Sequence, residues 1–129
     1  MRLALLITAA PDQETAFNAW RFAEAALRAG HELVRIFFAG NAVAHGNRLI
    51  TPGRDEIGLT RRWQQLQQAH QLDLVICVAA ALRHGVLDAD NARAWEQPQA
   101  NLADGFVISG LGQLAEAQLG ADRLVTFPG

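Results

Sequence analysis

Short apolar runs alternate with longer stretches of mixed polarity along the whole chain. Each run consists of consecutive apolar residues bounded by polar ones, which is typical of strands buried on both faces of a parallel sheet. The five predicted strands cover residues 2–8, 32–38, 72–77, 105–108 and 122–127. The stretches between them carry apolar residues at helical spacing or begin with helix-capping residues, and we predict helices there. The five predicted helices cover residues 14–29, 59–70, 79–84, 88–95 and 110–119.

Two of the predicted helices have apolar faces that we expect to lie on the sheet. The face of the helix at 14–29 consists of Phe17, Trp20, Ala23 and Leu27. The face of the helix at 110–119 consists of Leu111, Leu114 and Ala115. Phe22 lies outside the first of these faces, so it is a candidate either for a subunit contact or for the rim of the core.

The alternation of strands and helices predicts a parallel sheet that is covered on both faces. We therefore predict a three-layer α/β/α sandwich with about five strands, in a single domain that covers residues 1–129. Residues 39–58 interrupt the alternation, since glycine and proline recur there without any sustained apolar period. A loop of this length is functional, forms an interface, or is a mobile surface segment.

The composition narrows the class of protein. Hydrophobic residues make up 50% of the chain and charged residues 19%, which predicts a globular protein. The formal net charge is −2 and no basic run occurs, which argues against binding to nucleic acid phosphates. All 11 basic residues are arginine, so a Schiff-base lysine and a Walker A lysine are excluded. The single cysteine and the absence of a membrane-spanning apolar stretch predict a cytoplasmic protein without membrane contact.

Cys77, the only cysteine, lies where the strand at 72–77 meets the helix at 79–84. Ligands collect at the carboxyl ends of strands in open α/β sheets, and the positive end of a helix favours a thiolate. The alternative is that Cys77 is a small buried hydrophobic residue. Arg83 and His84 follow at roughly 9–10 Å from the helix start, at ~1.5 Å per residue. There they raise the local potential, or face solvent or a partner.

Ser109, Gly110, Leu111 and Gly112, with Ala115, form a G-x-G-x-x-A pattern between a strand and a helix. This pattern resembles a dinucleotide fingerprint, but it precedes the last strand and leaves no room for the acidic ribose contact. We expect instead a tight loop beside Cys77, because both segments lie at the carboxyl edge of the sheet. Its backbone N–H groups could stabilise an anionic sulfur atom or substrate.

Other common catalytic sites lack essential residues. Ser109 is the only serine, and Val107 replaces the first glycine of a nucleophile elbow. Asp88 and Asp90 lack the downstream calcium ligands and are expected at a helix start. The histidines are scattered and are expected at the surface or at helix caps, with His45 singled out by its place in the irregular segment. They are His31, His45, His70 and His84. No C-x-x-C pair exists for dithiol chemistry, and we expect no metal or cofactor.

Four segments together resemble a known family. They are ICVAAALRHGV at 76–86, GHELVRIFF at 30–38, RRWQQL at 61–66 and SGLGQLAEA at 109–117. The chain is similar, in order and over nearly its whole length, to the DsrE-like sulfurtransferase family and most closely to its TusD branch. It departs from the family at 41–50 and at His84, where close relatives carry arginine, and these departures concern partner choice more than chemistry.

The resemblance implies a sulfur relay in which Cys77 carries a persulfide. Sulfur would come from a TusA-like donor, pass to a TusE-like acceptor and end in 2-thiouridine at the tRNA wobble position, without direct tRNA binding by this chain. The resemblance also implies a hexamer with TusB-like and TusC-like subunits. Three alternatives stay open: a DsrE-type carrier in dissimilatory sulfur oxidation, a non-catalytic scaffold subunit, and a small-molecule or nucleotide-binding module that uses the loop at 109–112.

Overall fold

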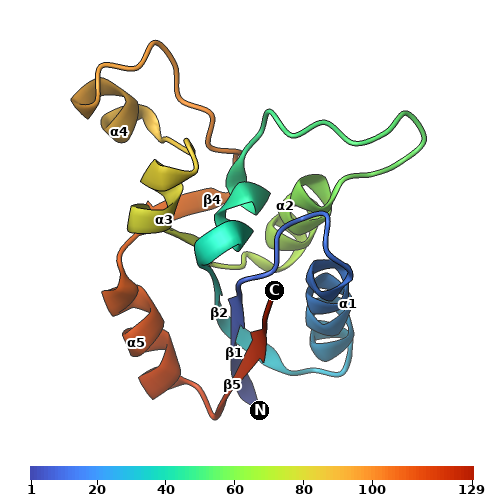
Figure 1. Ribbon diagram of the computed structural model, residues 1–129. Helices are drawn as coiled ribbons and strands as arrows, with labels where there is room; N and C mark the ends of the chain where they lie inside the picture. The colour runs from blue at the N-terminus through green and yellow to red at the C-terminus, as the bar shows by residue number, and fades with distance from the viewer.

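Five parallel strands form one sheet in the computed structural model, which describes residues 1–129 (Figure 1). The strands are β1 (Arg2–Ile7), β2 (Glu32–Phe38), β3 (Leu74–Cys77), β4 (Phe106–Ser109) and β5 (Arg123–Phe127). Their order is β4-β3-β2-β1-β5, so the chain begins near the centre, builds outward to β4 and crosses to the opposite edge for β5. All neighbouring strands pair in parallel, which confirms the predicted sheet.

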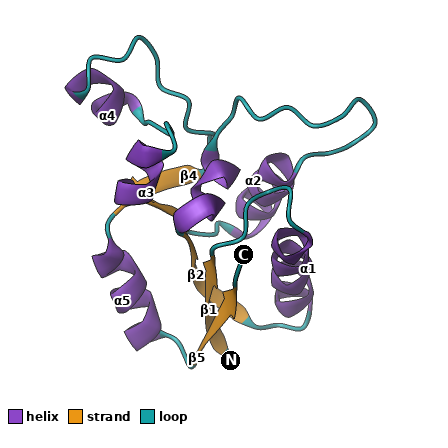
Figure 2. Cartoon of the chain, in the orientation of Figure 1, coloured by secondary structure: helices purple, strands orange, loops and turns teal.

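Helices lie on both sides of this sheet, as predicted (Figure 2). They are α1 (Glu14–Arg28), α2 (Leu59–His70), α3 (Val78–Arg83), α4 (Ala89–Ala94) and α5 (Leu111–Gly120). The paired helices α1 and α2 lie on one side and α5 on the other, while α3 follows the carboxyl end of β3 directly (Figure 1). None of these helices combines the length and the apolar character needed to cross a membrane.

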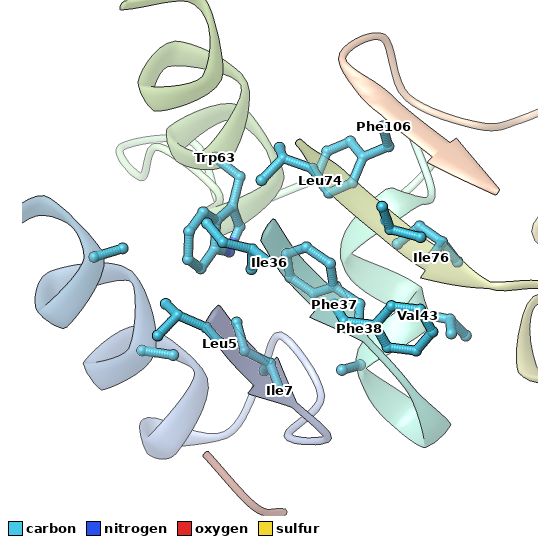
Figure 3. Close-up of a cluster of buried hydrophobic side chains, with 14 of the residues drawn as sticks. Leu5, Ile7, Ile36, Phe37, Phe38, Val43, Trp63, Leu74, Ile76 and Phe106 are labelled. Atoms are coloured by element: carbon cyan, nitrogen blue, oxygen red, sulfur yellow. The ribbon is translucent and has the colours of Figure 1, made fainter. Parts of the chain in front are cut away.

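An aromatic cluster joins the sheet to its covering elements. Phe38 of β2 lies at its centre, 5.5 Å from the ring of Trp63 in an edge-on arrangement and 5.6 Å from the ring of Phe106. Ile36 and Leu74 lie beside these rings (Figure 3). Such tilted and edge-on contacts stabilise the packing beyond the burial of apolar area. The cluster therefore connects β2, β4 and α2 in one core.

The predicted sheet-facing side of α1 is wrong in part. The residues of α1 that are buried are all alanines: Ala16, Ala19, Ala23 and Ala26. Phe17 is 37% exposed, and Trp20 and Leu27 pack only at the edge of the core. Small side chains bring the helix close to the sheet, and the larger ones are displaced to its sides. Phe22 contacts the ring of Phe127 at 5.5 Å, which agrees with the rim of the core.

The predicted face of α5 is also corrected. Leu114 packs against the core as expected, but Leu111 is 64% exposed and Ala115 is exposed too. The buried residue is Ala117, one turn further along the face of Leu114. Because α5 is apolar on more than one side, its spacing did not identify the face that meets the sheet.

The segment at 39–58 is irregular only in its second half. A 3-10 helix, η1 (Gly40–Gly46), follows β2 and buries Val43 and His45 completely. A Cβ atom at Gly46 would lie 3.0 Å from the side chain of Ile76, so glycine permits the close packing of η1 on β3. Residues 47–58 then form the long loop that extends from the fold in Figure 1, with Leu49 62% exposed.

Candidate functional site around Cys77

Cys77 is the last residue of β3 and the residue immediately before α3, as predicted. All four residues of β3 are buried, and the strand lies between β2 and β4. The backbone of Cys77 pairs with Ser109 at the end of β4, and Val78 begins α3 at once. The thiol is therefore fixed at the carboxyl edge of a central strand, where α/β proteins place ligands and chemistry.

The thiol is free, and 7% of Cys77 is exposed in this chain. The side chain makes no capping hydrogen bond to α3 and is in contact with the hydrophobic core. A thiol in this state can act as a nucleophile only when a reactant reaches the sulfur atom. The sulfur atom thus lies at the sheet edge without a hydrogen-bond partner and is almost completely covered by neighbouring atoms.

The loop that follows β4 lies next to Cys77, as expected. Ser109 is the register partner of Cys77, and Gly110 then caps α5. The N–H of Gln113 donates to the carbonyl of Gly110 at 3.0 Å, which closes the first turn. A Cβ atom built at Gly110 or Gly112 would meet no other atom within 4 Å, so the loop is open on its outer side.

A groove of about 920 Å³ begins at the first turn of α3, two residues beyond Cys77. Its walls are formed by α3, by the turn that follows it, by the start of the long loop and by the segment from Trp95 to Asn101. The only charged residues in its lining are Arg48 and Arg83, and neither forms an ion pair. Arg83 and His84 are both exposed, and Arg83 alone lines the groove. The sequence did not predict this groove.

Asn101 organises the groove, and no pattern in the sequence identified it. Its Nδ2 donates to the carbonyl of Gly85 at 2.9 Å and to Oδ1 of Asn47 at 3.1 Å. Its Oδ1 accepts from the N–H of Leu87 at 2.8 Å, and its carbonyl accepts from the N–H of Arg48 at 2.9 Å. One side chain and its backbone thus connect three segments that are far apart in sequence. The only sequence signal is an asparagine that ends a polar connection.

His45 is a core residue, which corrects the expectation of a surface or capping histidine. It is fully buried, and burial lowers its pKa from 6.5 to about 4. The ring is therefore neutral at pH 7, and its Nε2–H donates to the carbonyl of Ala9 at 3.1 Å. The hydroxyl of Thr60 donates to the carbonyl of His45 at 2.7 Å. His45 thus fastens η1 to the carboxyl edge of the sheet.

The sequence and the fold place this chain in a known class of proteins. Residues 1–127 match the DsrE/DsrF-like family, and the chain belongs to this family. A solved structure, the crystal structure of the ychN protein from E. coli, superposes with a TM-score of 0.76 at 25% identity. The superposition covers 98% of this chain and 100% of that one. The predicted family and fold are confirmed.

Curated relatives are similar over their whole length. A protein of Klebsiella pneumoniae named Sulfurtransferase TusD is 48% identical over 128 residues, which are 98% of this chain and 100% of that protein. A protein of Pseudomonas aeruginosa named Sulfurtransferase TusD homolog is 45% identical over 129 residues, with 100% and 98% coverage. The predicted enzyme class, a sulfurtransferase, is confirmed by the names of these relatives.

Proposed function

We propose that this chain carries sulfur as a persulfide on Cys77 within a sulfur relay. The observation that supports the proposal most is full-length similarity, at 48% identity, to proteins named Sulfurtransferase TusD, in a chain whose only cysteine ends a central strand. A relay needs one sulfur atom that accepts a group and releases it. A second cysteine in the same chain is not required.

The transfer consists of two exchanges at sulfur. First, the Cys77 thiolate attacks the outer sulfur of a donor persulfide; an S–S bond forms on Cys77, the donor S–S bond breaks, and the donor leaves as a thiolate that takes up a proton. Second, an acceptor thiolate attacks the outer sulfur on Cys77, and Cys77 leaves as a thiolate. Each step makes one S–S bond and breaks one, so no external oxidant or reductant is needed.

The partners are part of the proposal. We assign a TusA-like donor, a TusE-like acceptor and TusB-like and TusC-like subunits of a hexamer, with tRNA 2-thiouridine as the destination in the cytoplasm. Exposed apolar side chains on β4 and α5 support subunit contacts, since Val107 is 50%, Leu111 64% and Leu119 89% exposed. Dissimilatory sulfur oxidation would use the same chemistry on Cys77 with another destination.

A non-catalytic scaffold subunit is the second candidate. It is favoured by one observation, the 7% exposure of Cys77, because a silent cysteine in a core has the same burial. The two candidates differ in whether the folded chain accepts sulfur.

The deciding experiment loads the folded chain with a small persulfide donor and then adds a thiol acceptor. Mass spectrometry should show one additional sulfur atom on the peptide that contains Cys77, and its loss when the acceptor is added. Cys77→Ser is the control and should gain no sulfur, because a hydroxyl forms no persulfide. A native chain that gains no sulfur, although the unfolded chain reacts, would establish the scaffold.

A further inference from the structure

The groove beside α3 is cationic in a chain of net negative charge. Its two charged lining residues are Arg48 and Arg83, and no carboxylate lines it, whereas the whole chain has a formal net charge of −2. Arg83 has no ion-pair partner, and the guanidinium of Arg48 donates only to the backbone carbonyl of Ala100, at 2.8 Å. Two unneutralised guanidinium groups at one groove favour a ligand that carries carboxylates or other anions.

The rest of the lining combines apolar side chains with the polar side chains of Gln97, Gln99 and Asn101 and with unpaired backbone groups. Trp95 and Leu49 are each 62% exposed at this groove, and Leu82 and Leu87 also line it. The backbone N–H groups of Gln99 and Ala100 donate no hydrogen bond within the chain. Apolar pockets next to free backbone donors are the features with which proteins bind extended peptide segments.

A nucleic acid strand fits the groove less well. Phosphate binding depends on several basic side chains, and only two line this groove. The neighbouring helix α4 adds Asp90, which is paired with Arg93 at 3.7 Å, and Asp88 caps the same helix. A peptide segment with one or two carboxylates can avoid this rim of the groove, whereas a strand with a phosphate at every nucleotide cannot. The volume of about 920 Å³ also exceeds what a single small anion fills.

We propose that this groove binds an extended, acidic and apolar peptide segment of the protein that exchanges sulfur with Cys77. The proposal rests on the relay function and adds the chemistry of the partner to it. An apolar side chain of the segment packs on Trp95 and Leu49, and a carboxylate pairs with Arg83. Cys77 does not line the groove, which begins two residues further along the chain, so a segment bound there holds the partner beside the start of α3, directly after the residue that carries the thiol.

The test selects random linear peptides, displayed on phage, against the full chain in its Cys77→Ser form. This form prevents capture through a disulfide, so that selection reports the groove alone. Selected peptides should combine acidic with apolar residues, should bind more weakly as salt rises from about 0.05 M to about 0.5 M, and should shift the fluorescence of Trp95, the exposed tryptophan.

Three variants locate the binding. Arg83→Glu and Trp95→Ala should each weaken binding of the selected peptides about tenfold or more. Arg61→Glu is the matched control, because Arg61 is an exposed arginine of α2 outside the groove, and it should bind as the parent does. Circular dichroism of each variant should match the parent, since all three side chains are exposed.

Four results would overturn the proposal. They are the absence of selected peptides, selection without carboxylates, equal binding to Arg83→Glu, and displacement of the peptides by a single-stranded oligonucleotide. Self-association of the chain that Trp95→Ala abolishes would identify a second copy as the occupant instead. Sulfur loading of Cys77 from a small donor is measured separately, so a chain that accepts sulfur but binds no acidic peptide contradicts only the groove.

Discussion

Two inner strands of this sheet lead into short helical segments, and a buried histidine and a buried cysteine are held differently there. β2 leads into η1, where the ring of His45 donates to the carbonyl of Ala9 and the backbone carbonyl of His45 accepts from the hydroxyl of Thr60. β3 leads into α3, where the side chain of Cys77 makes no capping hydrogen bond and a groove begins within one turn. Both side chains are buried. The hydrogen bonds of His45 hold neighbouring segments of the fold together, whereas the side chain of Cys77 makes none.

The largest effect on activity should come from Cys77, whose side chain makes no hydrogen bond. Cys77→Ser should abolish sulfur transfer and lower the free energy of unfolding by only about 1–2 kcal/mol, because the two side chains have similar size and the one new cost is a nearly buried hydroxyl without a hydrogen-bond partner. Transfer of labelled sulfur and urea unfolding measure the two effects. A variant that still transfers sulfur, or that no longer folds, would contradict this distinction between Cys77 and His45.

Substitution of the hydrogen-bonded His45 should have the opposite effect, which is a loss of stability without a loss of thiol reactivity. His45→Ala should lower the free energy of unfolding by about 2–4 kcal/mol, because it leaves a cavity and removes the hydrogen bond to Ala9. Alkylation of Cys77 in the folded variant should proceed at the parent rate. Urea unfolding and a timed alkylation measure this pair of results; loss of thiol reactivity without loss of stability would assign His45 to the site instead.

The titration of His45 should make stability depend on pH. Burial holds the folded-state pKa near 4, below the ordinary 6.5, so the unfolded chain binds the proton more readily between these values. The stabilisation from the neutral ring is therefore complete above about pH 6.5 and is lost as the pH falls toward 4, by about 3 kcal/mol in total.

This dependence is measured by urea unfolding from pH 7 to pH 4.5. His45→Gln has no titrating ring and should lose less stability over the same range, so it corrects for the carboxylates that titrate there too. Parallel curves for the parent and His45→Gln would refute the assignment of a neutral buried ring.

The smallest effect should come from the rim of the groove. Arg83→Ala should slow sulfur transfer to a protein acceptor by about two- to fivefold at low salt, and by less at high salt, because an exposed charge mainly guides encounter. Transfer to a small thiol should be unchanged. Transfer that stops entirely at every salt concentration would mean that Arg83 touches the reacting sulfur atoms.

The sheet could be predicted from the sequence because burial on both faces leaves uninterrupted apolar runs, as in β3. Helix faces were harder, since α1 meets the sheet through alanines and its aromatic residues lie at the sides. Helical spacing alone does not distinguish a face of small residues that contacts the sheet from a neighbouring face of large residues that does not. The 3-10 helix that buries His45 also escaped prediction, because its mixed residues carry no helical period.

The candidate site was likewise predictable only in part. Cys77 and its neighbour Ser109 could be placed from local sequence, because Cys77 ends one predicted strand and Ser109 directly follows another, although β4 in fact includes Ser109. The groove could not, since its walls come from three separated segments whose meeting depends on the hydrogen bonds of Asn101. Hydrogen bonds between residues far apart in the sequence leave no local pattern from which such a groove could be predicted.

The register of Cys77 also affects how fast its sulfur can become accessible. Pairing with Ser109 holds the backbone before the thiol, and α3 holds it immediately after, so the main chain cannot move the sulfur outward without local unfolding. Access to the sulfur then depends on motions of the Cys77 side chain and of the neighbouring side chains that cover it, and side-chain motions are quicker than the meeting of two proteins. The lifetime of a persulfide on Cys77 would be set by how often the next partner arrives.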